Sequence, residues 1–174
     1  MNKPSIALIG FMATGKTSVG EALAKKLNYK FIETDKVIEE EAGKSIPKIF
    51  AEDGEVLFRE YEIAACKKVS QYNSYVISCG GGAVLNKINI DYLRKKCHIV
   101  LLTASIEEIY SRIMKDGKET RPVINKHEPK KEIREVLKFR EPFYKAAAEI
   151  IIDTTGKPFD EIIEEIITKI KVKN

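Results

Sequence analysis

The chain has 174 residues, of which 44% are hydrophobic and 32% are charged, a balance that excludes a disordered or fibrous protein. This length fits one domain with a sizeable core, so we expect a single unit over residues 1–174 that folds without a disulfide or metal. The formal net charge is only +4, from 30 Lys and Arg against 26 Asp and Glu. Such a small excess does not indicate a nucleic-acid partner, although it suits a small anionic ligand.

The cysteines and apolar runs indicate the compartment. Three cysteines without a Cys-x-x-Cys pair favour buried thiols in a reducing environment over a disulfide framework. His98 and His127 have no ligand-like neighbours in the sequence, so a zinc site is not expected. No signal-peptide pattern or membrane-spanning apolar run is present. We expect a cytoplasmic protein without a membrane partner, and we take it to be a monomer.

Short apolar runs of strand character alternate with longer amphipathic segments along the chain. Strands are predicted at residues 6–9, 31–32, 75–78, 99–102 and 150–152. Helices are predicted at residues 16–27, over 36–72 with breaks at Gly43, Pro47 and Gly54, at 88–96, after Ser105, at 130–148 and from Pro158 onward. This alternation predicts an α/β fold of three layers, with a five-stranded parallel sheet between helices on both faces.

Ligands of parallel α/β sheets lie at the carboxyl ends of the strands, so the residues that follow each strand are the candidate site. Asp35 follows the second predicted strand, and Gly80, Gly81 and Gly82 follow the third. Residues 115–129 hold one glycine, two prolines and many charges with little apolar periodicity. We expect these residues to form a surface loop that serves as a mobile lid.

The segment after the first strand is a phosphate-binding motif. Residues 10–17 read Gly-Phe-Met-Ala-Thr-Gly-Lys-Thr, which matches G-x-x-x-x-G-K-[ST] between a strand and a helix. Such a loop turns its N–H groups toward a phosphate at a helix N-terminus. Lys16 is placed to reach the β- and γ-phosphates, and the Thr17 hydroxyl is placed to bind Mg²⁺. The motif therefore predicts a nucleoside triphosphate and Mg²⁺, whereas a glycine-rich turn without a ligand would not explain this context.

A GTPase-like switch is an alternative within the P-loop proteins. Residues 153–156 match D-x-x-G, and residues 125–128 nearly match the guanine-reading N-K-x-D. The two motifs stand in the reverse of the GTPase order. Asn125 does not follow a strand, and the last position holds Glu128 in place of Asp. The switch is therefore disfavoured.

Two arginines suit an anionic acceptor. Arg140 lies on or beside the apolar face of its helix, where a guanidinium needs an anionic partner. An internal salt bridge is the alternative explanation for Arg140. For Arg59 the alternative is an intrahelical pair with Glu55 or Glu62.

Five ordered segments together carry a family pattern. They are GFMATGKTSVG at residues 10–20, FIETD at 31–35, GEVLFREYE at 54–62, GGG at 80–82, and RPVI at 121–124 followed by REPFY at 140–144. With these segments the chain resembles the shikimate kinases along nearly its whole length. The resemblance implies a P-loop kinase fold with a shikimate-binding region at about residues 35–62 and a lid at about 115–129. It also implies transfer of the γ-phosphate of ATP to the 3-hydroxyl of shikimate, a step of chorismate and aromatic amino acid biosynthesis.

The resemblance implies a role for each acceptor-side residue. Lys16, Asp35 and Arg121 would be catalytic, with Asp35 bound to the ring hydroxyls and Arg121 closing over the phosphates. Arg59 and Arg140 would bind the carboxylate of shikimate, a role that suits the planar guanidinium. The turn of Gly80, Gly81 and Gly82, called the glycine turn below, would let the backbone approach the ligand closely. The implied substrate-binding set is Asp35, Arg59, Gly80, Gly81, Gly82 and Arg140.

The resemblance also implies the nucleotide and metal sites. The implied ATP-binding set is Gly10, Ala13, Thr14, Gly15, Lys16, Thr17, Ser18, Arg112, Arg121, Asp153, Thr154 and Pro158. Within it, Arg112 and Pro158 would flank the adenine. Thr17 would bind Mg²⁺, and Glu33 would act on the metal through water, at a position where the family usually has Asp.

Two further functions stay open. A related P-loop kinase acting on another hydroxy acid, such as gluconate, is disfavoured because Asp35, Arg59 and Arg140 together favour a cyclic carboxylate. A nucleotide-binding regulatory module without transfer activity is disfavoured because all the acceptor residues are present.

Overall fold

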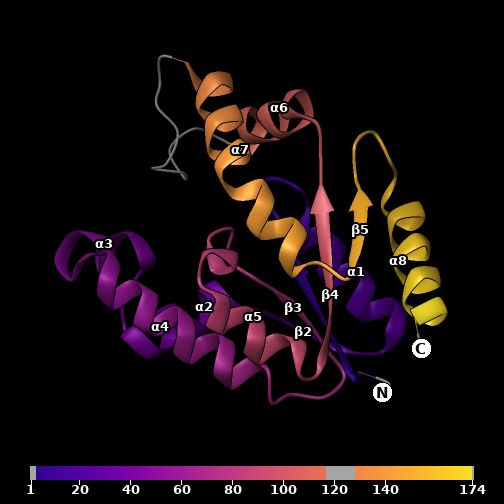
Figure 1. Ribbon diagram of the computed structural model, residues 1–174, viewed down its shortest axis with the longest axis horizontal. Coiled ribbons are helices and arrows are strands. Elements are labelled where there is room, and N and C mark those ends of the chain that lie inside the picture. The colour runs from indigo at the N-terminus through magenta and orange to yellow at the C-terminus, as the bar shows by residue number, and fades with distance from the viewer. Residues whose placement is uncertain (1–2, 117–127, 174) are drawn as a thin grey trace.

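The computed structural model describes residues 3–116 and 128–173 (Figure 1). The strands are β1 (Ser5–Ile9), β2 (Lys30–Glu33), β3 (Tyr75–Ser78), β4 (Cys97–Thr103) and β5 (Ile150–Asp153). The helices are α1 (Lys16–Leu27), α2 (Thr34–Ala42), α3 (Ile46–Glu52), α4 (Gly54–Val69), the single 3-10 turn η1 (Ala83–Leu85), α5 (Lys87–Arg94), α6 (Ile106–Asp116), α7 (Pro129–Ala147) and α8 (Phe159–Lys173).

The five strands form one parallel sheet in the order β2-β3-β1-β4-β5. Strand β1 lies at the centre, buried at every position, as its unbroken apolar run predicts. The chain leaves β1 toward β2 on one side and later returns to β4 on the other. The carboxyl end of β1 is therefore the point where the winding reverses, the usual place for a ligand in such sheets.

Helices cover both faces of the sheet, which confirms the three-layer α/β/α prediction. On one face, α1 and α8 pack Leu23 and Ile166 against Leu8 of β1. On the other face, a larger apolar cluster includes side chains from α2 to α7, such as Ile38 and Ile133. All three cysteines are buried and free within this second cluster, consistent with their expected role as small core side chains.

Three of the predicted boundaries were wrong. Pro47 does not break a helix but lies in the first turn of α3, where its missing N–H costs nothing. The predicted loop at 115–129 is too long at both ends, because α6 continues to Asp116 and α7 begins at Pro129. The rest of that loop, with Arg121, lies outside the described residues, so the lid stays a prediction.

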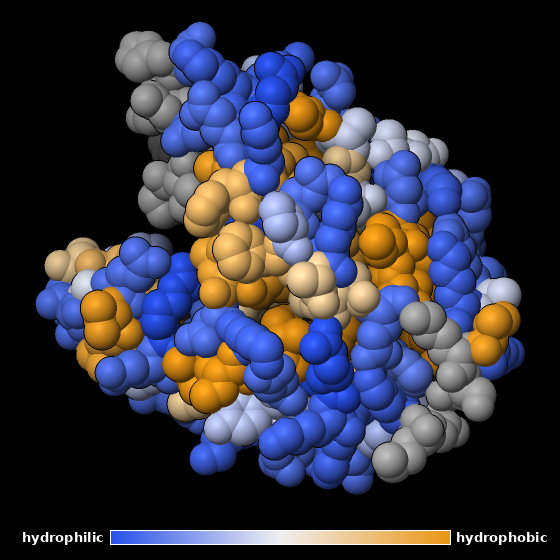
Figure 2. Space-filling model, in the orientation of Figure 1, coloured by the Kyte–Doolittle hydropathy of each residue, from blue (hydrophilic) through white to orange (hydrophobic). Residues whose placement is uncertain are grey.

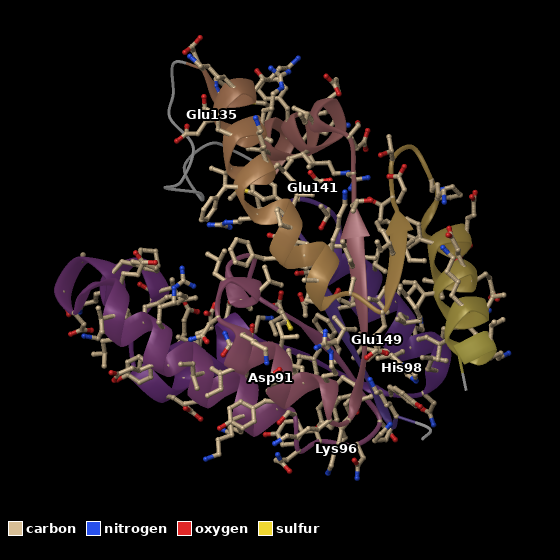
Figure 3. The ribbon with its side chains drawn as sticks, in the orientation of Figure 1. Asp91, Lys96, His98, Glu135, Glu141 and Glu149 are labelled. Carbon is tan, nitrogen blue, oxygen red and sulfur yellow. The ribbon has the colours of Figure 1, made fainter. Side chains whose placement is uncertain are left out.

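A small polar cluster closes the opposite end of the sheet (Figure 3). His98 at the start of β4 is buried, and its Nδ1 lies 3.3 Å from Oε2 of Glu149, just before β5. Lys3 pairs with the same carboxylate. The cluster ties the N-terminal segment to β4 and β5 at the edge remote from the strand carboxyl ends. Among the described helices, none has the length and apolar character needed to cross a bilayer.

Candidate active site

The loop between β1 and α1 has the backbone that its motif predicts. Gly10 and Gly15 have φ angles of 146° and 96°, and Ala13 also has a positive φ of 57°. A Cβ at Gly10 would lie 2.3 Å from the carbonyl oxygen of Leu102, so only glycine fits there. Lys16 Nζ donates to the carbonyls of Gly10 at 2.9 Å and Phe11 at 2.8 Å, which places the ammonium inside the curve of the loop.

Arg112 of α6 joins this loop to the end of β5. Its Nη1 donates to the carbonyl oxygen of Ala13 at 3.1 Å, and its Nη2 donates to the carbonyl oxygen of Thr154 at 3.2 Å. Its Nε donates to Glu108 one turn earlier on α6 at 3.0 Å. The guanidinium lines the cavity beside the P-loop, as a nucleotide-binding role requires.

Thr154 lines the cavity, as the sequence implied, but its hydroxyl is bonded to protein groups. The side chain is only 1% exposed. Its hydroxyl lies 3.1 Å from the carbonyl oxygen of Thr14 and 2.9 Å from that of Thr103, and it accepts from Arg112 Nη1 at 3.2 Å. A hydroxyl engaged in this way holds protein groups together. Asp153, next to it, accepts from the amide and hydroxyl of Thr155 and so closes a turn.

The predicted metal residues lie in direct contact. The Thr17 hydroxyl donates to Oε1 of Glu33 at 2.6 Å, and Lys36 Nζ lies 2.9 Å from Oε2. Partial burial alone would raise the pKa of Glu33, but the hydrogen bonds from Thr17 and Lys36 outweigh burial and lower it. An ionised carboxylate beside a hydroxyl offers the hard oxygen ligands that Mg²⁺ prefers, with phosphates and water completing its shell. The residues present therefore fit a magnesium ion.

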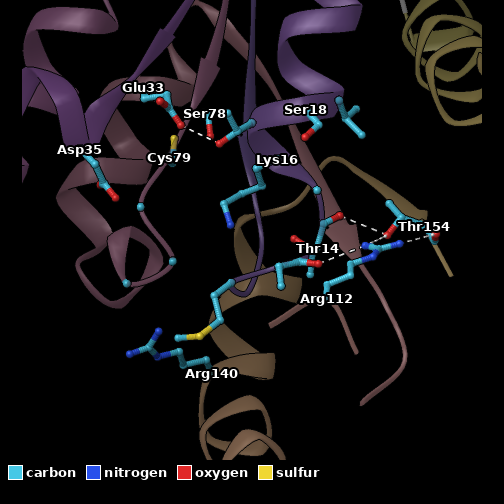
Figure 4. A pocket seen from close by; sticks show the side chains of 18 of the residues that line it. Thr14, Lys16, Ser18, Glu33, Asp35, Ser78, Cys79, Arg112, Arg140 and Thr154 are labelled. Carbon is cyan, nitrogen blue, oxygen red and sulfur yellow. Dashed lines mark hydrogen bonds between the residues drawn. The ribbon is translucent and has the colours of Figure 1, made fainter. Parts of the chain in front are cut away.

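Asp35 faces the same space from the first turn of α2 (Figure 4). The side chain is accessible to solvent through the cavity, yet the surrounding protein limits its hydration and raises the pKa of the carboxyl. Lys16 opposes that rise through its positive charge. A Cβ on Gly80 would lie 2.6 Å from Oδ1 of Asp35, so the first glycine of the turn makes room for this carboxylate.

Arg59 on α4 combines both readings that the sequence left open. It pairs with Glu55 at 3.0 Å and Glu62 at 3.1 Å on its own helix, and it also lines the cavity. Glu62 is 2% exposed and accepts a second hydrogen bond from Asn89 Nδ2 at 3.2 Å. Burial raises the pKa of Glu62, while Arg59 counteracts the rise. The pair fixes the guanidinium against Gly82, where a Cβ would lie 2.9 Å from Nη1.

Arg140 reaches the glycine turn from the opposite side, on α7. Its Nη1 lies 3.7 Å from where a Cβ of Gly81 would stand. Within residues 3–116 and 128–173, no acidic side chain forms an ion pair with Arg140, so the internal salt bridge finds no support there. Arg59 and Arg140 thus converge on one turn, Arg59 held by its two carboxylates and Arg140 without an ion pair among the described residues.

These groups line one cavity with a volume of about 760 Å³, large enough for a nucleotide and a small acceptor. Figure 2 shows the surface hollowed between the lobe of α3 and α4 and the upper part of α7. In Figure 4, Lys16 points into the cavity between Asp35 on one side and Arg112 with Thr154 on the other. The predicted residues that line it are Ala13, Thr14, Gly15, Lys16, Thr17, Ser18, Glu33, Asp35, Arg59, Gly80, Gly81, Gly82, Arg112, Arg140 and Thr154.

Of the predicted residues that the structure describes, three do not line this cavity: Gly10, Asp153 and Pro158. Sequence reasoning also missed its apolar wall, made by Ile46, Phe50 and Phe58. The rings of Phe50 and Phe58 lie 4.5 Å apart between centroids. The only signal for this wall was Phe58 next to Arg59, since an apolar residue in a helix is more often a core residue.

Known proteins agree with this geometry. A sequence model of the shikimate kinase family matches residues 12–171. The shikimate kinase of Caldanaerobacter subterraneus subsp. tengcongensis is 46% identical over 163 residues, and the match covers 94% of each chain. A solved structure titled as shikimate kinase from Acinetobacter baumannii in complex with shikimate is 31% identical, with a TM-score of 0.91. That match covers 99% of this chain and 95% of the other.

The alternatives fare less well. A gluconokinase from Sinorhizobium meliloti 1021 has a TM-score of 0.59 at 18% identity, over 99% of this chain and 94% of the other. A likeness at that identity shows a shared fold alone and does not favour gluconate. The D-x-x-G at residues 153–156 forms a turn at the end of β5. It therefore gives no support to a GTPase switch. Because the family match runs from the P-loop to α8, the chain belongs to the shikimate kinase family of ATP-dependent kinases.

Proposed function

We propose that the chain transfers the γ-phosphate of ATP to the 3-hydroxyl of shikimate. The observation that carries this proposal is the single cavity in which Lys16 and the P-loop face Asp35, with Arg59 and Arg140 converging beyond it on the glycine turn. The proposal includes action as a monomer. It also includes a cytoplasmic location, since buried free thiols are typical of reducing compartments.

The nucleotide half of the site orients a triphosphate. The N–H groups of the P-loop and the N-terminus of α1 bind the phosphates, and Lys16 turns from the loop carbonyls to the β- and γ-oxygens. Thr17 and Glu33 would hold Mg²⁺, which neutralises phosphate charge when bound. Arg121 is proposed to cover the phosphates, a role that rests on the family resemblance alone.

The acceptor half positions a carboxylated ring. Arg59 and Arg140 would bind the carboxylate from two helices, which fixes the ring against the wall of Phe50 and Phe58. The 3-hydroxyl oxygen attacks the γ-phosphorus, and the bond from that phosphorus to the β-phosphate oxygen breaks. ADP leaves with the electron pair, and Asp35 accepts the hydroxyl proton, a task favoured by its raised pKa.

The test is ADP release with and without shikimate. We expect shikimate to raise the rate by a large factor and gluconate to leave it at the basal level. Lys16→Ala should abolish transfer while its circular dichroism stays that of the wild type. Equal ADP release with and without shikimate would refute the proposal, and a response to gluconate would move the chain to the other kinase class.

Arg140→Ala separates an acceptor-binding role of Arg140 from a structural one. We expect a higher KM for shikimate with an unchanged KM for ATP, because the variant loses a contact made in the ground state. If thermal stability falls while both KM values hold, Arg140 serves the fold instead of the acceptor.

A further inference from the structure

Tyr144 joins two parts of the acceptor site without lining the cavity. It lies one helical turn after Arg140 on α7, and its side chain is 3% exposed. Its hydroxyl donates a hydrogen bond of 2.6 Å to the carbonyl oxygen of Gly81, which stands 63 residues away in sequence. The positive charge of Arg140 lowers the pKa of the same hydroxyl, against the larger effect of burial. Tyr144 therefore bonds the glycine that Arg140 Nη1 approaches from the other side.

Gly81 is the point where the two halves of the site meet. A Cβ there would lie 3.7 Å from both Arg140 Nη1 and the carbonyl oxygen of Gly10, and 3.8 Å from the amide of Met12. The Gly81 peptide thus lies between the P-loop and Arg140. A small shift of this peptide would change the distance between the bound phosphates and the bound carboxylate, on which in-line transfer depends.

The rest of the turn is anchored elsewhere. The amide of Gly80 donates to the Thr34 hydroxyl at 3.0 Å, and the carbonyl oxygens of Gly80 and Gly82 accept from Ala83 and Leu85 at 3.0 Å. Tyr144 supplies the bond at the middle residue, Gly81. Burial raises the pKa of Tyr144 to about 12, so its hydroxyl stays protonated and donates over the whole working pH range.

We propose that Tyr144 is a positioning residue, whose hydroxyl holds the Gly80–Gly82 turn and Arg140 in one fixed arrangement for the carboxylated acceptor. The alternative is a core tyrosine that donates to the nearest carbonyl and affects stability alone. The inference rests on the proposed function for its kinetic consequence, but the anchoring of the turn is independent of the substrate.

Tyr144→Phe is the test, since it removes one oxygen atom and keeps the ring. Loss of one buried hydrogen bond should raise the shikimate KM by roughly five- to tenfold, with the ATP KM changed by less than about twofold. Hydrogen exchange of the free enzyme, followed by mass spectrometry, should speed up in residues 80–85 and stay unchanged in β1. Tyr75→Phe is the matched control, because Tyr75 packs against Tyr72 at the far end of the sheet and should alter neither measurement.

Each outcome decides the matter. An unchanged shikimate KM and unchanged exchange in residues 80–85, with or without a lower melting temperature, would make Tyr144 a core residue only. If the wild-type enzyme shows no response to shikimate, the proposed function fails. Exchange in residues 80–85 then judges the anchoring by itself, with faster exchange in Tyr144→Phe supporting it and equal exchange refuting it.

Discussion

The hydroxyl of Thr17 donates a 2.6 Å hydrogen bond to the carboxylate of Glu33. The family resemblance implies Asp at this position, and the Glu found here is one methylene longer. Lys36 binds the second oxygen at 2.9 Å. The two hydrogen bonds hold the carboxylate in place and lower its pKa, as the proposed role through a metal-bound water requires.

Glu33→Gln should weaken the response to magnesium. The amide keeps the size of the side chain but loses the charge that attracts the hydrated cation. We expect the Mg²⁺ concentration for half-maximal activity to rise about tenfold or more. Calorimetric titration of ADP at several Mg²⁺ concentrations gives the same shift without turnover. Glu33→Asp is the control and should stay within about threefold of the wild type. If the Gln variant keeps the wild-type magnesium dependence, Glu33 has no metal role.

Glu62→Gln should raise the shikimate KM by about tenfold while the ATP KM holds, because Arg59 loses the buried charge that positions it. Glu55→Gln is the matched control. Glu55 binds the same guanidinium from the surface, where an ion pair contributes little, so its KM should change by less than about twofold. Steady-state kinetics with each substrate varied in turn checks both. Equal effects of the two variants would show that burial of Glu62 is irrelevant to the acceptor.

These residues show how far the sequence leads. The fold could be predicted because each strand covered on both faces reads as an apolar run, and helices such as α1 and α8 show a 3.6-residue apolar stripe. The P-loop and Asp35 could be predicted because their chemistry is contiguous in sequence and follows a strand. The boundaries at Pro47 and Pro129 were wrong because proline suits a first helical turn as well as a break.

The missing parts of the site depend on pairs remote in sequence. The bond from Tyr144 to Gly81 spans 63 residues, and the bond from Thr154 to Thr14 spans 140. Periodicity can place each partner on a buried face, but it carries no information on which buried partner it meets. The residues that touch the ligands are therefore more predictable than the residues that hold them in place.

The pH dependence of catalysis should report Asp35. The carboxylate must be ionised to accept the hydroxyl proton, and restricted hydration raises its pKa. Activity should therefore increase with pH through a pKa above the ordinary range of Asp. Profiles of kcat/KM for shikimate between about pH 5 and pH 8 would show this limb. Asp35→Asn should lower kcat by about 100-fold or more and remove the limb.

The raised pKa of Asp35 makes stability fall with pH, whereas it makes activity rise with pH. A raised pKa means that the folded state binds the proton more tightly than the unfolded chain, so the free energy of unfolding falls as pH rises from the unfolded to the folded pKa. Glu62 contributes with the same sign, and Glu33 with the opposite sign. Denaturant unfolding should show a shallower fall in Asp35→Asn. If the low-pH limb of the kcat/KM profile persists in Asp35→Asn and disappears in Glu62→Gln, the titrating group in that profile is Glu62.

Thr154 should act on nucleotide binding through the P-loop. Its buried hydroxyl lies within hydrogen-bond distance of the carbonyl oxygens of Thr14 and Thr103 and accepts a hydrogen bond from Arg112. Thr154→Val keeps the shape of the side chain but leaves these groups without their partner. We expect a loss of about 1–3 kcal/mol in stability and about fivefold weaker ADP binding, with the shikimate KM unchanged.

Thr154→Ser should restore both stability and ADP binding, because it keeps the hydroxyl. Thr103→Val is the control, since that hydroxyl bonds Ile152 and leaves the P-loop untouched. Calorimetry and thermal melts separate the two effects: a less stable Thr154→Val enzyme that binds ADP like the wild type would confine Thr154 to packing.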